Sequence, residues 1–126
     1  MLKKFILMTI KSLLTVWFVA GVCFATPVMA KEQQPDIAWQ KINANATLID
    51  VRTPEEFAAG HIKGAINIPF DTIVPQLAKL NLSKDTEVVL YCRSGRRSSI
   101  AQASLIEHGY HNTYDAGGLN TLMSTR

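Results

Sequence analysis

Along this chain, short apolar runs of the kind found in strands alternate with stretches in which apolar residues recur at helical spacing. Four short apolar runs are typical of buried strands. They cover Thr47–Val51, Ala65–Ile68, Thr86–Tyr91 and Thr113–Asp115. Helices are predicted between and around these runs. Some are indicated by apolar residues at helical spacing, and the shorter ones by turn and cap residues. These predicted helices cover Ile37–Ile42, Thr53–Gly60, Asp71–Leu80, Ser98–His108 and a terminal stretch from Leu119. Strands that alternate with helices predict an α/β domain with a parallel sheet.

The helix predicted after the first strand carries clear boundary residues. Thr53 is the expected N-cap, and Pro54 stands at the first helical position. Glu56 is placed to complete a capping box with Thr53, and Gly60 is expected to end the helix.

The first 30 residues differ in composition from the rest. Lys3, Lys4 and Lys11 make the start basic, thirteen uncharged residues follow over 13–25, and small residues stand near Ala30. This layout predicts a cleaved signal peptide over 1–30 and a periplasmic location. The alternative is an uncleaved membrane anchor, but thirteen residues fall short of the roughly 20 that span a bilayer. A polar leader (31–36) and one domain (37–126) would follow.

Cleavage would change the charge balance. Three of the 13 basic residues and none of the 10 acidic residues lie in 1–30, so the mature chain would carry no net charge. We therefore expect no nucleic-acid partner, and membrane contact only through the signal peptide during export. Ninety-six residues suffice for one small domain, which we expect to be a monomer.

Cysteine usage points to a reactive thiol. Cys23 would leave with the signal peptide, so Cys92 would remain alone and could form no internal disulfide. A single cysteine in an exported protein is either an intermolecular partner or a reactive group. The histidines His61, His108 and His111 show no metal-ligand spacing with Cys92. The sequence therefore predicts no metal site.

Cys92 ends an apolar run, and a short loop leads from it into a helical pattern. A thiol at a helix N-terminus should have a lowered pKa. Arg93, Arg96 and Arg97 stand where positive charge opposes the helix dipole, which indicates that the loop binds an anion. The alternatives are a buried structural thiol and solvated arginines.

Two stretches resemble the rhodanese family. Residues 50–69 (DVRTPEEFAAGHIKGAINIP) resemble its N-terminal signature, and residues 91–98 (YCRSGRRS) resemble its active-site loop. The resemblance implies a three-layer α/β fold, with a five-stranded, mainly parallel sheet and helices on both faces. It also implies a thiosulfate sulfurtransferase that passes sulfur through a persulfide on a catalytic Cys92 to cyanide, a thiol or a protein acceptor. By the same resemblance, we expect the reaction to need neither a metal nor an organic cofactor.

The loop residues expected to bind the substrate are Arg93, Ser94, Gly95, Arg96, Arg97 and Ser98. Their backbone N–H groups can stabilise negative charge, and the arginines can recruit a dianion. Two other functions remain open: a persulfide carrier with little free turnover, and a phosphatase or arsenate reductase. A phosphatase-type loop needs arginine six positions after the cysteine, where this chain has Ser98.

Three polar residues of the first signature are ambiguous. Asp50 and Arg52 lie at the end of the strand predicted over Thr47–Val51, and they either border the pocket or form a structural ion pair or loop brace. His61 is expected to fix the turn after the capped helix rather than to act as a base.

Overall fold

The computed structural model describes residues 33–126. The predicted signal peptide and the first two residues of the polar leader lie outside the described residues.

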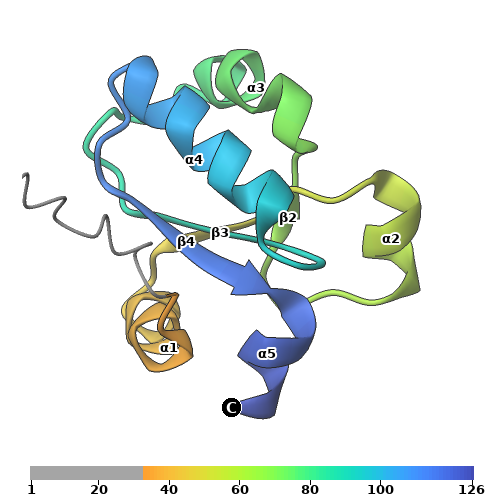
Figure 1. Ribbon diagram of the computed structural model, residues 1–126. Coiled ribbons are helices and arrows are strands. Elements are labelled where there is room, and N and C mark those ends of the chain that lie inside the picture. Colours follow the sequence, from red (N-terminus) through yellow and green to blue (C-terminus); the bar gives the residue numbers. More distant parts are fainter. Residues whose placement is uncertain (1–32) are drawn as a thin grey trace, which may run out of the picture. The chain divides into compact units, whose positions relative to one another are not determined.

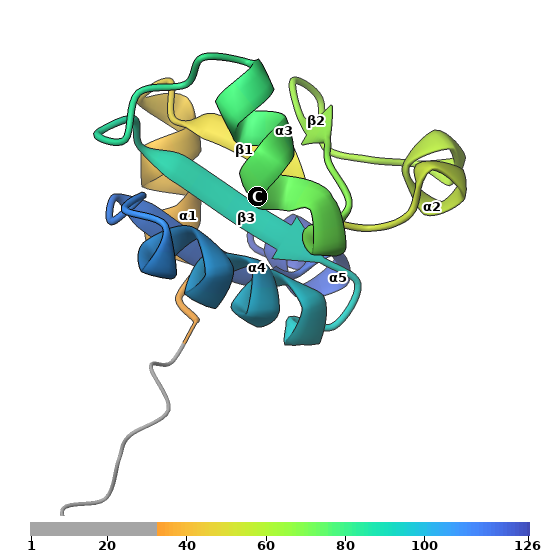
Figure 2. The same ribbon diagram turned by 90° about the horizontal axis from the view of Figure 1, so that it is seen from above.

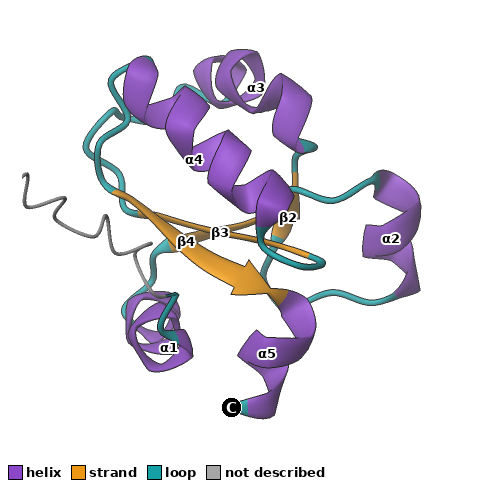
Figure 3. Ribbon diagram, viewed as in Figure 1, coloured by secondary structure: helices purple, strands orange, loops and turns teal. Residues whose placement is uncertain are grey.

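The core is a parallel sheet of four strands, in the order β2-β1-β3-β4 (Figure 3). The strands are β1 (Thr47–Asp50), β2 (Ile66–Asn67), β3 (Val88–Cys92) and β4 (Thr113–Gly118). All four arise from the apolar runs that predict them. The fifth strand, which only the resemblance implied, is wrong for the described residues, because no further apolar run stands between their helices.

Helices cover both faces of the sheet, which confirms the three-layer fold (Figure 1). One face carries α3 (Ile73–Lys79) and α4 (Arg96–Glu107), and the other carries α1 (Pro35–Asn43) and α5 (Leu119–Ser124). The short α2 (Pro54–Ala59) lies to one side, as Figures 1 and 2 both show. None of the helices within 33–126 is long and apolar enough to cross a bilayer.

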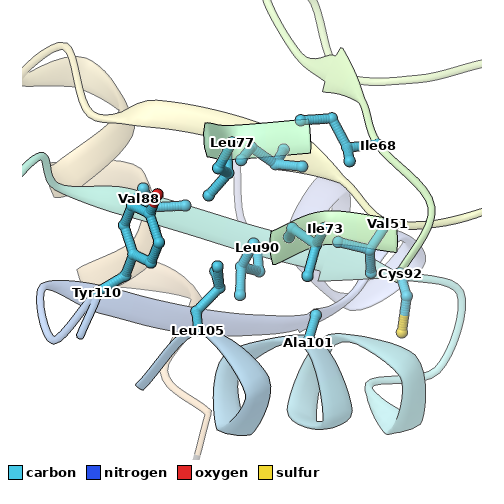
Figure 4. Packing of buried hydrophobic residues seen from close by; sticks show 11 residues of the cluster. Val51, Ile68, Ile73, Leu77, Val88, Leu90, Cys92, Ala101, Leu105 and Tyr110 are labelled. Atoms are coloured by element: carbon cyan, nitrogen blue, oxygen red, sulfur yellow. The ribbon is translucent and has the colours of Figure 1, made fainter. Parts of the chain in front are cut away.

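Strand β3 divides its side chains between the two layers, because successive residues of a strand point to opposite faces. Val88, Leu90 and Cys92 join the cluster under α3 and α4 (Figure 4). Val89 and Tyr91 join the cluster on the side of α1 and α5. All five residues are buried, so β3 is the centre of both cores.

Three element boundaries differ from the prediction. Helix α4 begins at Arg96 rather than Ser98, because Gly95 adopts a left-handed conformation and serves as the N-cap. A 3-10 turn, η3 (Phe70–Thr72), precedes α3. Strand β4 runs on to Gly118, which pairs with Cys92 after an irregularity in the ladder. The predicted capping box of α2 is present, with Thr53 and Glu56 bonded in both directions.

We predict that Tyr91→Phe destabilises the domain by about 1–3 kcal/mol, because it leaves a buried backbone donor without an acceptor. The Tyr91 hydroxyl is fully buried and accepts the Ile62 N–H at 3.1 Å. Urea unfolding measures the change. Tyr110→Phe is the matched control, since Tyr110 is equally buried and its hydroxyl makes no hydrogen bond to residues 33–126. Equal effects of the two variants would contradict this assignment.

Candidate active site

The candidate site lies where β1 and β3, the two central strands, both end. The chain leaves β1 toward β2 and leaves β3 toward β4, on the opposite side. Open α/β sheets bind ligands at such a reversal of strand order, outside the carboxyl ends of the strands. Cys92 is the last residue of β3, and Asp50 is the last residue of β1.

The Cys92 sulfur sits inside the turn that joins β3 to α4. The Gly95 N–H donates to Sγ at 2.9 Å, and the Ser98 hydroxyl lies 3.5 Å from the sulfur. That hydroxyl also donates to the Gly95 carbonyl at 3.0 Å, which closes the loop on itself. Only 1% of Cys92 is exposed, so the sulfur is held almost entirely by protein atoms.

Two opposing effects act on the pKa of Cys92. Burial raises it, because burial penalises the thiolate. Hydrogen bonds from the Ser98 side chain and from the backbone of Ser98, Gly95 and Ser94 lower it, and together they outweigh burial. The pKa of Cys92 is therefore lowered, which confirms the direction that the sequence predicts.

Two glycines allow this turn. Gly95 has φ +97°, in the left-handed region that other residues avoid. Gly118, across the ladder from Cys92, lies so near the loop that a Cβ there would stand 2.7 Å from the Arg93 carbonyl oxygen. The loop and the end of β4 therefore pack backbone against backbone.

The three loop arginines divide into two kinds. Arg93 and Arg96 are exposed, as is Ser94, and neither arginine forms a salt bridge with any described residue. Arg97 is half-buried and engages both carboxylate oxygens of Glu56, at 2.6 and 2.9 Å. The structure thus leaves two of the three predicted anion-binding arginines free of acidic partners within 33–126.

Glu56 is a residue whose second contact the sequence analysis missed. Its capping role in α2 was predicted, but its bidentate pair with Arg97 joins α2 to α4 across 41 positions of sequence. The hydrogen bonds from Arg97 lower the pKa of Glu56 to about 2. No local pattern indicates this pairing, because helix spacing relates only residues three or four apart.

Asp50 and Arg52 form a buried ion pair. Arg52 Nη2 lies 2.7 Å from Asp50 Oδ2, and the same group donates to the Gly60 carbonyl at 2.7 Å. The Asn67 amide adds hydrogen bonds to the carbonyls of both residues. Of the two roles that the sequence left open, the structural ion pair is therefore present, and Arg52 also lines the neighbouring cavities.

His61 fixes the turn after α2, as predicted. Its ring stacks on Phe57 with the centroids 3.6 Å apart, and Nδ1 lies 2.8 Å from the Phe57 carbonyl oxygen.

Asp115 is a second site-supporting residue that the sequence did not single out. Its carboxylate is buried and accepts hydrogen bonds from Ser99 of α4, from Gln33 and from the Gly117 N–H. It ties the first turn of α4 to β4 beside the cysteine loop.

Two cavities border the loop. The larger, of about 430 Å³, includes Val51, Arg52 and Arg97 in its lining. The smaller, of about 280 Å³, is lined by Arg93 and Glu56 with Ala59, Leu119, Asn120 and again Arg52. Residues 33–126 contain no cluster of three or more side chains suited to holding a metal ion.

This geometry defines a class of protein: a parallel α/β domain that holds a cysteine in a tight loop between a strand and a helix. The chain belongs to the rhodanese-like domain family, whose sequence profile matches residues 34–122.

Known relatives show what the chain is similar to. It is 40% identical over 74 residues to thiosulfate sulfurtransferase PspE of Escherichia coli (strain K12), covering 59% of this chain and 71% of the relative. It is 38% identical over 78 residues to the tRNA uridine(34) hydroxylase of Hamiltonella defensa, covering 59% of this chain but only 22% of that protein. A solved E. coli rhodanese with anions superposes with a TM-score of 0.57 at 40% identity, covering 60% of this chain and 88% of the other.

We predict that Ser98→Ala raises the pKa of Cys92, because the variant removes a hydroxyl that lowers this pKa. Thiolate absorbance near 240 nm, titrated against pH, measures the change, with Cys92→Ser supplying the background. Ser99→Ala is the matched control, since the Ser99 hydroxyl binds Asp115 and not the sulfur. An unchanged midpoint in Ser98→Ala would show that the hydroxyl does not act on the thiolate.

We predict that Glu56→Gln lowers the free energy of unfolding by about 1–2 kcal/mol near neutral pH. Because the pKa of Glu56 falls from 4.5 to about 2 on folding, its stabilisation is present above pH 4.5 and is lost as the pH falls toward 2. Urea unfolding at several pH values should therefore show the variant and the wild type converging in acid. Glu55→Gln, one residue away and in no ion pair within 33–126, should show a smaller difference; a pH-independent gap would refute the assignment.

Proposed function

We propose that this protein is a thiosulfate sulfurtransferase in which Cys92 carries the transferred sulfur. The observation that carries the proposal is the Cys92 sulfur bonded to the Gly95 N–H at the N-cap of α4, with a lowered pKa. Membership of the rhodanese-like family and the similarity to PspE support a sulfurtransferase.

In the first step the Cys92 thiolate attacks the outer sulfur of thiosulfate. A new S–S bond forms, the original S–S bond breaks, and sulfite leaves with the bonding electron pair. Cys92 then carries a persulfide. The Gly95 N–H donates to Sγ at 2.9 Å, so it stabilises the negative charge that Cys92 carries before the attack and again when the thiolate is regenerated in the second step.

In the second step an acceptor takes the outer sulfur. Cyanide, or a thiolate from a small molecule or protein, attacks that sulfur, and the Cys92–S bond breaks to regenerate the thiolate. The S–S bond is about 2 Å long, so the persulfide carries its outer sulfur beyond the buried position of Sγ. Neither step uses a metal or an organic cofactor.

The loop residues divide the work of binding. Arg93 and Arg96, exposed and without acidic partners in the described chain, attract the dianion. Gly95 and Ser98 hold the sulfur, and Ser94 supports it through its backbone N–H. Arg97, held by Glu56, fixes the loop against α2.

Export to the periplasm is part of the proposal. It rests on the basic start, the uncharged stretch and the small residues near Ala30.

We predict that Cys92→Ser abolishes thiocyanate formation from thiosulfate and cyanide, because no other described residue offers a thiol. The assay uses the full chain, and Cys23→Ser is the matched control, which should keep wild-type activity. An active Cys92→Ser variant would overturn the proposal.

The same preparations separate the alternative functions. After exposure to thiosulfate, mass spectrometry should show one added sulfur on the wild type and none on Cys92→Ser. Rapid loss of that sulfur to cyanide marks an enzyme, whereas a persulfide that small acceptors discharge only slowly marks a carrier. Cys92-dependent hydrolysis of a phosphate ester would instead favour the phosphatase alternative.

A further inference from the structure

Two residues of the polar leader are fastened to the end of the sheet beside the cysteine loop. The Gln33 side-chain amide donates to Asp115 Oδ2 at 2.7 Å, across 82 positions of sequence. The Tyr114 hydroxyl accepts the Gln34 N–H and donates to the Gln34 carbonyl oxygen, both at 3.1 Å. Two successive leader residues are therefore bonded to two successive residues of β4.

The Gln33 amide fills the space beside two glycines. A Cβ at Gly95 would stand 3.1 Å from Gln33 Oε1 and 3.3 Å from Gln33 Nε2. A Cβ at Gly117 would overlap Gln33 Oε1, and Gly117 also has a left-handed φ of +82°. The amide thus occupies the positions into which side chains of these two residues would project.

Gly95 is the residue whose N–H holds the reactive sulfur. That N–H donates to Cys92 Sγ at 2.9 Å, and the Gly95 carbonyl accepts the Ser98 hydroxyl at 3.0 Å. Glycine has the widest backbone freedom of all residues. A contact that limits the movement of Gly95 therefore also limits the movement of its N–H relative to the sulfur.

Asp115 anchors the Gln33 amide at this place. Its carboxylate also accepts the Ser99 hydroxyl at 2.7 Å and the Gly117 N–H at 3.0 Å, and the residue is buried. Hydrogen bonds to carboxylates are stronger than those between neutral groups. The carboxylate is fixed by α4 and β4, so the amide that it accepts is fixed relative to the turn as well.

We propose that Gln33 is a positioning residue of the active site: its amide, anchored by Asp115, holds Gly95 so that the Gly95 N–H stays directed at the Cys92 sulfur. Gln33 acts through Gly95 and not on the sulfur itself. The inference rests on the proposed function only in taking Cys92 as the reacting group. Without the amide, Gly95 gains freedom, its hydrogen bond to the sulfur weakens, and the thiol is favoured over the thiolate.

The first test compares Gln33→Ala with Gln34→Ala in the full-length protein. Both variants remove a glutamine side chain from the leader, but Gln34 is exposed and its hydrogen bonds to Tyr114 use backbone atoms. Thiolate absorbance near 240 nm, titrated against pH, should show a raised pKa of Cys92 in Gln33→Ala and the wild-type pKa in Gln34→Ala. Cys92→Ser supplies the background. Arg97, whose charge interacts with Cys92, is present throughout.

Hydrogen exchange followed by NMR measures the restraint on Gly95 directly. We expect the Gly95 amide to exchange about fivefold faster in Gln33→Ala, as for the net loss of one hydrogen bond. The amides of β3 should keep their wild-type rates, because they report global unfolding rather than the turn. Gln33→Met, which keeps the bulk of the side chain but cannot donate to Asp115, is a milder variant in which changes in the same direction are expected.

Three results would overturn the positioning role. They are an unchanged pKa of Cys92 in Gln33→Ala, an unchanged exchange rate of the Gly95 amide, and equal effects of Gln34→Ala. Faster exchange of the β3 amides in step with Gly95 would also contradict it, since the effect would then be a general loss of stability. Both measurements follow Cys92 and Gly95 without any substrate, so a failure of thiocyanate formation would count against the proposed function alone.

Discussion

The hydrogen bond from the Gly95 N–H to the Cys92 sulfur is the contact around which the rest of the site is arranged. Burial by itself would raise the pKa of Cys92 and leave an inert thiol. The turn reverses that effect, because it directs N–H groups and the Ser98 hydroxyl at the sulfur. A left-handed Gly95 makes this turn possible, and the close approach of Gly118 presses the end of β4 against it. Reactivity here comes from backbone geometry more than from charged side chains.

Ion pairs around the loop have a different task. Asp50 with Arg52 secures the end of β1 to the turn at Gly60, and Glu56 with Arg97 secures α2 to α4. Each pair neutralises an arginine near the loop that, from the sequence alone, could be taken for an anion-binding residue. Of the three arginines that follow Cys92, Arg93 and Arg96 are therefore the ones that remain without a salt bridge within 33–126.

Much of the fold follows from local pattern. Each of the four apolar runs became a strand, and the Thr53–Glu56 box begins α2 as expected, because such signals depend on neighbours a few residues apart. The start of α4 was predicted two residues late, since apolar periodicity does not register the arginines of its first turn. The fifth strand was implied only by the family resemblance, and no apolar run of the described residues predicted it. Asp115 escaped notice because its importance lies in three donors from separate parts of the chain.

The amino-acid sequence by itself determined the α/β order, the position of Cys92 between a strand and a helix, and the glycine that lets the loop close. These features depend on hydrophobic period and backbone freedom, which are properties of short segments. Only the tertiary structure decided which arginines remain free, which carboxylates stay unpaired, and what lies beside the sulfur. Those outcomes depend on contacts such as Glu56 with Arg97, 41 positions apart, and contacts at that distance exist only once the sheet has brought the segments together.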